Sequence, residues 1–566
     1  MRRLSNVLLI IFLLSTLELS AQSQPKNWSK TDIKKAEKWV EEKYNSLSQN
    51  EKLGQLFIVA LYTNKGDNHI DEIRNIVSRE QIGGLILMQD DAAKEITLVN
   101  EFQQKSKTPM MIGMDAEWGL YQRIAAAHKY PWAMTLGAIQ DKSLIEKMSA
   151  KIAEDCHRMG INWDFAPVVD VNTNPNNPII GNRSFGSEVK NVTQSALAYS
   201  NGLQNNNILA AIKHFPGHGD TNADSHLDLP VVSHNLNRLN EIELAPFKAL
   251  MSKGIGGVMV AHLYVPALES GKGIPASVSK NIITGLLKEK FGYKGLIITD
   301  ALNMGAVANK YKPGELDAMA FKAGNDIMLF SQGVAEGKRL IQKAIDNGEI
   351  PQARVEESVK KILLTKYYLG LNEYQPKNPS NINNDLNNDS HKKLVQNLYS
   401  NALTLLKDDK KLLPLNKTST YYYVPLEEAP YQTFEDRLQL DAKIIVKKAS
   451  EISSIPANST VIIGFHKDNS TAYKPYKISA DSKKILAELA KKNNVILNVF
   501  GSAYALKDID ISKVSTVLVS YENNEDSMTA TADALRGRTK ISGKLPVLVN
   551  DQLKAGMGIA LDCLKQ

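Results

Sequence analysis

Short apolar runs alternate with longer amphipathic stretches from about residue 30 to residue 370 of the chain. The runs lack the polar alternation of strands with one wet face, so they predict strands buried on both sides. The stretches between them are long enough for crossover helices. Eight runs can be counted: LGQLFIVA from Leu53, GGLILM from Gly83, PMMIGM from Pro109, INWDFAPVVD from Ile161, ILAAIKHF from Ile208, GGVMVAH from Gly256, GLIITD from Gly295 and NDIMLF from Asn325.

Eight βα units in about 340 residues favour one closed parallel barrel over an open sheet. The predicted fold class is therefore α/β, with a (β/α)8 TIM-type barrel at residues 22–375. The asparagine-rich, apolar-poor stretch at 376–390 predicts a linker. Beyond it, six more apolar runs separated by helix-like segments predict a smaller αβα sandwich domain at residues 391–566.

The first 21 residues have the pattern of a secretory signal peptide. Arg2 and Arg3 precede the apolar run VLLIIFLL, and small residues precede Gln22. The apolar run is too short to span a bilayer, so we expect an exported protein, periplasmic or extracellular, without stable membrane insertion. Cys156 and Cys563 fall in different predicted domains, so no disulfide framework is expected.

Composition and charge exclude several broad classes. The chain has 566 residues, of which 43% are hydrophobic and 23% charged, as in ordinary globular proteins rather than disordered or many-pass membrane chains. Lys+Arg exceeds Asp+Glu by 68 − 61 = 7, with no basic run. Nothing in this charge pattern indicates a nucleic-acid partner.

Several apolar runs end in ionisable residues. All strand C-termini of a parallel barrel share one face, so these side chains are expected to meet where barrel enzymes place their chemistry. The alternative is that charged residues end a buried strand because the chain emerges into water there; five cases on one face weaken that alternative. The residues are Asp115, Asp170, Lys213 with His214, His262 and Asp300.

The segment KHFPGHGDTNADSHLDLP, residues 213–230, is the densest in chemistry-bearing side chains. Its spacings match neither a helical HExxH pair nor a thiolate set, so metal binding is disfavoured. Acid/base work by Asp224 and His226 is favoured, because residues two apart in an extended loop point the same way. An ordinary loop or capping role for the same pair stays open.

Asp300 ends the seventh run and precedes ALNMGAV. It can be the N-cap of the next helix or a carboxylate nucleophile at the barrel mouth.

With these residues in view, the chain resembles glycoside hydrolase family 3, in particular its β-N-acetylglucosaminidase type. The likeness is specific because four matching motifs occur in the same order. They are DAEWGLYQR from Asp115, FAPVVDVNTNPNNPIIGNRSFG from Phe165, KHFPGHGDTNADSH from Lys213 and LIITDALNMGAV from Leu296. NALTLLKDDKKLLPL from Asn401 and the stretch from Ser520 resemble the family's second domain, so the likeness covers nearly the whole predicted mature chain.

The resemblance implies roles for particular residues. Asp300 would be the nucleophile, and His226 the acid/base assisted by Asp224, in retaining hydrolysis of terminal β-linked N-acetylglucosamine with no metal or cofactor. Peptidoglycan fragments or chitin oligosaccharides would be the substrates. The sugar hydroxyls would be held by Asp115, Arg123, Arg183, Lys213 and His214.

One position departs from the family pattern. Many relatives carry two glycines after the Glu of the first motif, whereas here Trp118 precedes Gly119, so the indole is expected either to narrow a neighbouring subsite or to stack on it. Three alternatives to hydrolysis of this substrate stay open. They are a phosphorylase or a β-glucosidase on the same scaffold, and a glycan-binding protein without catalysis; the last has no need of Asp300, His226 and Asp224 together.

Overall fold

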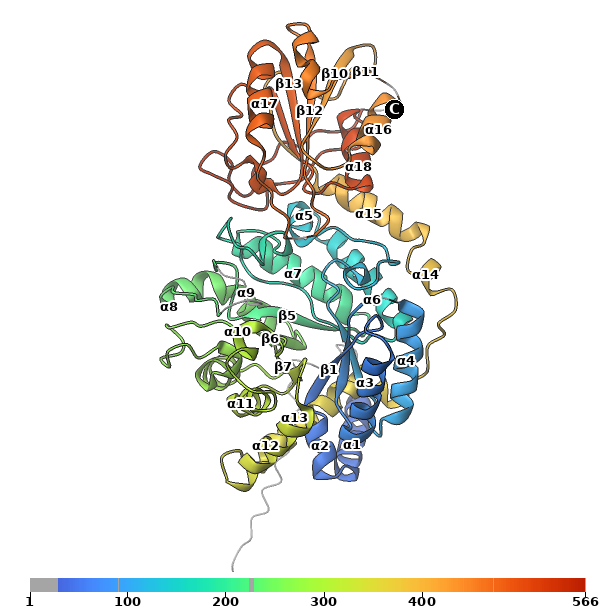
Figure 1. Ribbon diagram of the computed structural model, residues 1–566, viewed down its shortest axis with the longest axis vertical. Helices are drawn as coiled ribbons and strands as arrows, with labels where there is room; N and C mark the ends of the chain where they lie inside the picture. The colour runs from blue at the N-terminus through green and yellow to red at the C-terminus, as the bar shows by residue number, and fades with distance from the viewer. Residues whose placement is uncertain (1–28, 90, 223–228, 441, 472, 565–566) are drawn as a thin grey trace, which may run out of the picture.

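A computed structural model describes residues 29–564 apart from 90, 223–228, 441 and 472. The predicted signal peptide, Asp224 and His226 lie outside the described residues. The chain forms a barrel with a smaller sheet domain stacked against one side of it (Figure 1).

The barrel contains the eight predicted strands. Every strand residue is buried, which explains why the runs carry no polar alternation. Neighbouring strands pair in parallel in the order β7-β6-β5-β4-β3-β2-β1-β8, and the parallel bridge Ile298–Ile327 joins the two ends. The strands are β1 (Phe57–Leu61), β2 (Gly84–Leu87), β3 (Met111–Met114), β4 (Trp163–Asp164), β5 (Leu209–Phe215), β6 (Gly257–Val260), β7 (Leu296–Thr299) and β8 (Met328–Leu329). The predicted TIM-type barrel is confirmed.

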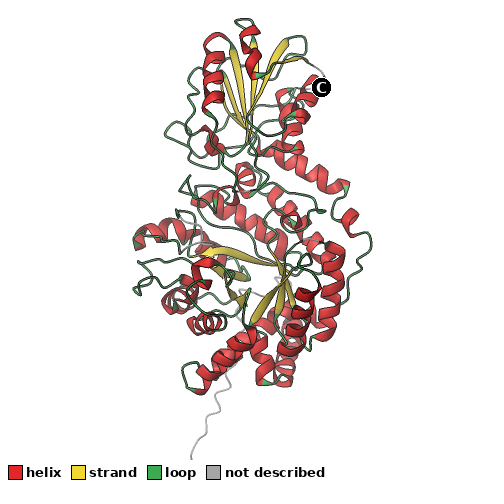
Figure 2. Ribbon diagram, in the orientation of Figure 1, coloured by secondary structure: helices red, strands yellow, loops and turns green. Residues whose placement is uncertain are grey.

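Helices cover the outside of the barrel (Figure 2). Local sequence sets their ends. At the start of α1 the Ser29 side chain accepts the Asp32 amide, and the Asp32 carboxylate accepts the Ser29 amide. At the end of α6, Gly160 has φ 79°, a conformation that favours glycine. The α-helices are α1 (Lys30–Ser46), α2 (Gln49–Gly54), α3 (Asp67–Glu80), α4 (Ala92–Lys105), α5 (Ala133–Ala138), α6 (Ser143–Met159), α7 (Val189–Gln204), α8 (Leu236–Arg238), α9 (Ala245–Met251), α10 (Gly305–Ala308), α11 (Glu315–Ala323), α12 (Val334–Asp346) and α13 (Gln352–Tyr368). The crossover between β6 and β7 is π-helical, at Asn281–Lys290.

The second domain is a six-stranded sheet between two helical layers. Alternate residues of β12 face opposite layers: Val461 and Ile463 pack on the side of α17, and Ile462 on the side of α16 and α18. Only β9, among the described strands, runs antiparallel to its neighbour. The order is β11 (Lys443–Val446), β10 (Thr420–Leu426), β12 (Thr460–His466), β13 (Asn494–Phe500), β14 (Thr516–Val519) and β9 (Thr404–Asp408), with α16 (Gln432–Gln439), α17 (Ala480–Lys492) and α18 (Glu525–Leu535). The predicted αβα sandwich is confirmed.

Two helices connect the domains along one flank (Figure 1). The stretch predicted as a linker contains α14 (Ile382–Asp385), whose Asp385 accepts a hydrogen bond of 2.8 Å from Nε of Arg158 in the barrel. α15 (Asp389–Ala402) then packs against α5 of the barrel and α18 of the second domain. The connection therefore lies against both domains.

Candidate active site

A cavity of about 590 Å³ opens at the carboxyl ends of the barrel strands. Most of its lining residues lie at the ends of the barrel strands or in the loops that follow them, as expected for this fold. The second domain closes one side with Ser470, Thr471 and Tyr473. The polar and aromatic barrel residues of the wall are Tyr62, Asp115, Glu117, Trp118, Tyr121, Gln122, Arg123, Arg183, Lys213, His214, His218, Asp300, Asn303 and Phe330.

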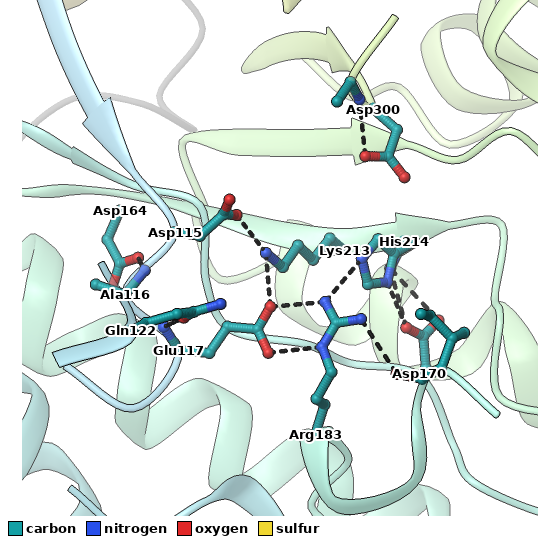
Figure 3. A network of polar contacts seen from close by, with 12 residues as sticks. Asp115, Ala116, Glu117, Gln122, Asp164, Asp170, Arg183, Lys213, His214 and Asp300 are labelled. Atoms are coloured by element: carbon teal, nitrogen blue, oxygen red, sulfur yellow. Dashed lines mark hydrogen bonds and ion pairs between the residues drawn. The ribbon is translucent and has the colours of Figure 1, made fainter. Parts of the chain in front are cut away.

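A network of alternating charges forms the floor of this cavity (Figure 3). Nζ of Lys213, on β5, lies 2.8 Å from Oδ1 of Asp115 and 2.9 Å from Oε1 of Glu117. Arg183 donates two hydrogen bonds to the Glu117 carboxylate, at 2.9 and 2.6 Å. Arg123 donates to the other oxygen of Asp115 at 2.5 Å. Two cations therefore share each carboxylate, which fixes the geometry of all five side chains.

The network keeps its carboxylates ionised in spite of burial. Burial raises the pKa of Asp115, but the charges of Lys213 and Arg123 outweigh it and hold the pKa well below its usual range. In the same way, burial raises the pKa of Glu117, and Arg183 and Lys213 lower it to about 2. Asp115 thus presents a fixed anionic acceptor to the cavity.

His214 is oriented by a buried carboxylate. Oδ2 of Asp170 lies 2.7 Å from Nδ1 of His214, and Oδ1 accepts the His218 amide at 2.6 Å. Nε2 of His214 lies 3.3 Å from the Arg183 guanidinium. Burial lowers the pKa of His218 to about 4, so this second imidazole is neutral.

Asp300 follows β7 directly, on the opposite wall from this network (Figure 3). One carboxylate oxygen accepts the Ala301 amide at 2.8 Å. Burial raises the pKa of Asp300, but the charges of His214 and His262, with the Ala301 hydrogen bond, lower it overall. The side chain is therefore an anion at neutral pH, in contact with the cavity.

The structure brings six of the sequence-predicted residues into one cavity: Asp115, Arg123, Arg183, Lys213, His214 and Asp300. Their individual roles stay predictions, as do those of Asp224 and His226, which lie outside the described residues.

Two residues of the network were not predicted as site residues. Glu117 could have been found because it stands two positions after Asp115 in the first motif. Asp170 was noted as a strand end, but its bond to His214 depends on two strands meeting, which no local pattern reveals.

Trp118, the departure from the family pattern, lines the cavity. Its ring packs edge-on against Trp132, with centroids 6.3 Å apart. The indole is therefore part of the cavity wall rather than a surface side chain.

Two kinds of feature are absent from the described residues. No group of three or more His, Cys, Asp or Glu side chains in the described part of the chain could hold a metal ion. None of the helices described there has the length and apolar character needed to cross a bilayer.

Ionised carboxylates and fixed cations at the carboxyl ends of the strands of a parallel barrel are typical of an enzyme that binds a polar substrate in this cavity. Residues 48–365 match the family described as Glycosyl hydrolase family 3 N terminal domain. The chain belongs to glycosyl hydrolase family 3.

Relatives and solved structures agree with this assignment over both domains. Beta-hexosaminidase A of Pseudoalteromonas piscicida is 31% identical over 553 residues, covering 85% of this chain and 91% of that protein. The structure of a family 3 β-N-acetylglucosaminidase from Paenibacillus sp. str. FPU-7 is 28% identical with a TM-score of 0.72, covering 89% of this chain and 99% of that one. Beta-glucoside phosphorylase BglX is 25% identical with a TM-score of 0.78, covering 93% and 98%.

Proposed function

We propose that the protein is an exo-acting, retaining β-N-acetylhexosaminidase. The observation that carries the proposal is the shared cavity, in which the anionic Asp300 faces the network around Asp115, Lys213 and Arg183. The relatives named above as hexosaminidase and β-N-acetylglucosaminidase support the choice of sugar. Because both domains close around the cavity, a terminal sugar is favoured over the middle of a chain.

The proposed reaction has two displacements. A carboxylate oxygen of Asp300 attacks the anomeric carbon while His226 gives its proton to the departing glycosidic oxygen. The resulting glycosyl ester is then attacked by water, whose proton returns to His226 as the ester bond breaks. Asp224 orients His226 and stabilises its protonated form.

Fixed charges position the sugar for this attack. Asp115 accepts from ring hydroxyls because it is held ionised, while Arg123, Arg183, Lys213 and His214 direct donors toward the same space. None of these groups has to reorganise during the reaction, which favours the charged transition state.

We further propose that the enzyme is exported to the periplasm or beyond by residues 1–21, and acts there on peptidoglycan fragments or chitin oligosaccharides. The leader pattern supports export. Comparing the protein found in washed cells, periplasm and medium tests it: a cytoplasmic protein with an intact N-terminus would contradict export.

Paired aryl substrates test the activity. We expect release of the phenol from an aryl N-acetyl-β-glucosaminide to exceed that from the β-glucoside at least 100-fold, without phosphate. Turnover that depends on phosphate and yields the sugar 1-phosphate would identify a phosphorylase, the activity for which one structural neighbour is named. Preference for the glucoside would identify a β-glucosidase.

A second experiment tests the acid/base. His226→Ala should lose most activity on substrates with poor leaving groups, because these need a proton in the first step. Added azide should restore part of the turnover on activated substrates by replacing water as the nucleophile. Equal losses for all leaving groups would contradict the role of His226.

A further inference from the structure

His262 is a fully buried histidine that does not line the cavity at the barrel mouth, the active cavity. It follows β6, and Asp300 follows the neighbouring strand β7. Its Nε2 lies 3.0 Å from the Ala301 carbonyl oxygen, and its Nδ1 lies 2.7 Å from Oγ of Ser277. Because the imidazole lies outside the cavity wall, any effect that it has on the reaction passes through its neighbours.

The two partners of His262 decide which nitrogen donates. A carbonyl oxygen only accepts hydrogen bonds, so Nε2 carries a proton and donates to Ala301. The Ser277 hydroxyl donates to Nδ1 of the neutral imidazole and accepts from Nδ1 of the protonated one. The bond to Ala301 is therefore kept in either charge state, and Ser277 holds the proton of the neutral form on Nε2.

The peptide group that joins Asp300 to Ala301 lies between two peptide groups that are themselves held. In the peptide group before it, the Asp300 amide donates to the Val260 carbonyl at 2.9 Å. The peptide group after it carries the Ala301 carbonyl, which accepts from His262. The direction of the Ala301 amide is therefore fixed from both sides.

Two further hydrogen bonds support the turn that follows Asp300. The Met304 amide also donates to the Ala301 carbonyl, at 3.0 Å, and the Leu302 amide donates to the Leu329 carbonyl at 3.0 Å. Loss of the bond from His262 should therefore loosen this turn without unfolding it.

The Ala301 amide distinguishes the two oxygens of the Asp300 carboxylate. It donates to Oδ1 at 2.8 Å, and no residue in the described part of the chain donates to Oδ2 (Figure 3). Oδ2 is thus the oxygen available to form a bond with the anomeric carbon, and Oδ1 then becomes the carbonyl oxygen of the ester. When water attacks the anomeric carbon and its bond to Oδ2 breaks, the electron pair returns to the carboxylate, which the same amide stabilises.

We propose that His262 is a positioning residue for the nucleophile. Through the Ala301 carbonyl it holds the Ala301 amide on Oδ1 of Asp300, which leaves Oδ2 to attack. Ser277 takes part because it keeps the donated proton on Nε2. The proposal rests on the proposed function, in which Asp300 forms the glycosyl ester. Loss of this donor should slow ester formation and leave sugar binding, which depends on the network around Lys213, nearly unchanged.

The rate of ester formation tests the role of His262. The full chain is mixed with a slow fluorinated N-acetyl-β-glucosaminide, and mass spectrometry follows the labelled fraction with time. In His262→Asn the side-chain amide is too short to reach Ala301, so labelling should be about 30-fold slower than in the wild type, as for a misplaced reacting group. Labelling should still go to completion, and inhibition by N-acetylglucosamine should be unchanged. A folding defect would instead lower the final labelled fraction at the wild-type rate.

Three further variants separate the donor from other effects. In His262→Gln the side-chain nitrogen takes the place of Nε2, so labelling should return to within about three-fold of the wild-type rate. Ser277→Ala should slow labelling about five-fold, because the proton is no longer held on Nε2. His157→Asn is the matched control: it removes an imidazole bond to a carbonyl, that of Asn206 at 2.6 Å, before β5 at the opposite end of the barrel. Its labelling rate should equal that of the wild type.

The outcomes separate the positioning role from the function. If the wild type is neither labelled nor able to release N-acetylglucosamine, the proposed function is wrong. If the wild type is labelled, the function stands, and the positioning role is wrong when His262→Asn and Ser277→Ala label at the wild-type rate or when His262→Gln is as slow as His262→Asn. In a structure of the labelled wild type, the Ala301 amide should bond the ester oxygen that does not carry the sugar. A sugar on the oxygen that Ala301 binds would also overturn the proposal.

Discussion

Glu117 is the residue that joins the cations of the site to one another. It is 7% exposed, receives two hydrogen bonds from Arg183 and lies 2.9 Å from Lys213. Removing its charge leaves the buried Arg183 without its carboxylate partner and Lys213 with Asp115 alone, which is costly in a low dielectric. The proposed sugar-binding roles of Asp115 and Arg183 thus depend on Glu117, for which no contact with the sugar is proposed.

Glu117→Gln should lower kcat/KM on an aryl N-acetyl-β-glucosaminide about 100-fold and reduce stability by about 3 kcal/mol, the usual cost of breaking a buried pair. Steady-state kinetics and thermal unfolding measure both. Glu488→Gln, at an exposed position on α17, should change neither. Wild-type activity in Glu117→Gln would show that the network is structural only.

The proposed nucleophile, Asp300, predicts how kcat/KM behaves on the acidic side of the pH profile. Burial raises the pKa of Asp300, but nearby cations and the Ala301 amide lower it below the ordinary value of 3.8. The carboxylate therefore stays ionised as pH falls to that value, so kcat/KM should show no loss from Asp300 above it. Re-assay at pH 6 after acid incubation controls for unfolding. A fall in kcat/KM that accompanies protonation of the Asp300 carboxylate in the folded enzyme and is centred above pH 5 would contradict this.

At the scale of elements, the strands were predictable and their meeting points were not. Strands β1 to β8 are short, wholly buried and mostly apolar, so the sequence marks them without reference to tertiary structure. The π-helical form of Asn281–Lys290 was not predicted, because the apolar pattern of that segment does not distinguish helix types. Contacts such as Asp170 with His214 depend on which strand ends converge, which the closure of the barrel decides.

The end of β3 is held by a carboxylate on β4. Oδ1 of Asp164 accepts the Ala116 amide at 3.0 Å, and Oδ2 accepts the Tyr199 hydroxyl at 3.2 Å. Ala116 lies between Asp115 and Glu117, so Asp164 fixes the backbone that carries both. Burial raises its pKa from 3.8 to about 7.

This shift predicts a pH-dependent stability. Between pH 3.8 and about 7 the folded protein retains on Asp164 a proton that the unfolded chain has released. Stability should therefore fall as pH rises across this interval and level off above it. Asp164→Asn should remove this component, so its Tm relative to wild type should increase from pH 4 to pH 8. A constant Tm difference would contradict the assignment.

At the scale of the whole molecule, a buried carboxylate of the second domain attaches that domain to the barrel. Glu522 is 1% exposed and accepts the Trp132 amide at 2.9 Å and the Thr135 hydroxyl at 2.8 Å, at the start of α5. Lys129 lies 3.3 Å away. Trp132 in turn packs against Trp118, which lines the cavity at the barrel mouth. The contact between the domains is therefore connected to the wall of the candidate active site.

Glu522→Ala should lower the free energy of unfolding by about 3 kcal/mol, because it leaves buried donors and a lysine without their acceptor. Proteolysis between residues 376 and 390 should become faster as the domains separate more often. Glu525→Ala, at an exposed position in the first turn of α18, is the control and should change neither. Unchanged unfolding in Glu522→Ala would show that other contacts dominate the interface.

The contribution of the second domain to the active cavity could not be predicted from the sequence. Ser470, Thr471 and Tyr473 lie about 170 residues after Asp300, in a segment without a catalytic motif. They reach the cavity only because of how the two domains dock. The four barrel motifs, by contrast, contain most of the charged residues of the site, so those residues could be predicted from the sequence.

The most direct test of the account is to trap the glycosyl-enzyme. A slow fluorinated N-acetyl-β-glucosaminide should label the protein once, and mass spectrometry of the digested enzyme should locate the sugar ester on the peptide containing Asp300. Asp300→Ala should not be labelled. A sugar ester on any other residue, or turnover by Asp300→Ala at the wild-type rate, would contradict the account.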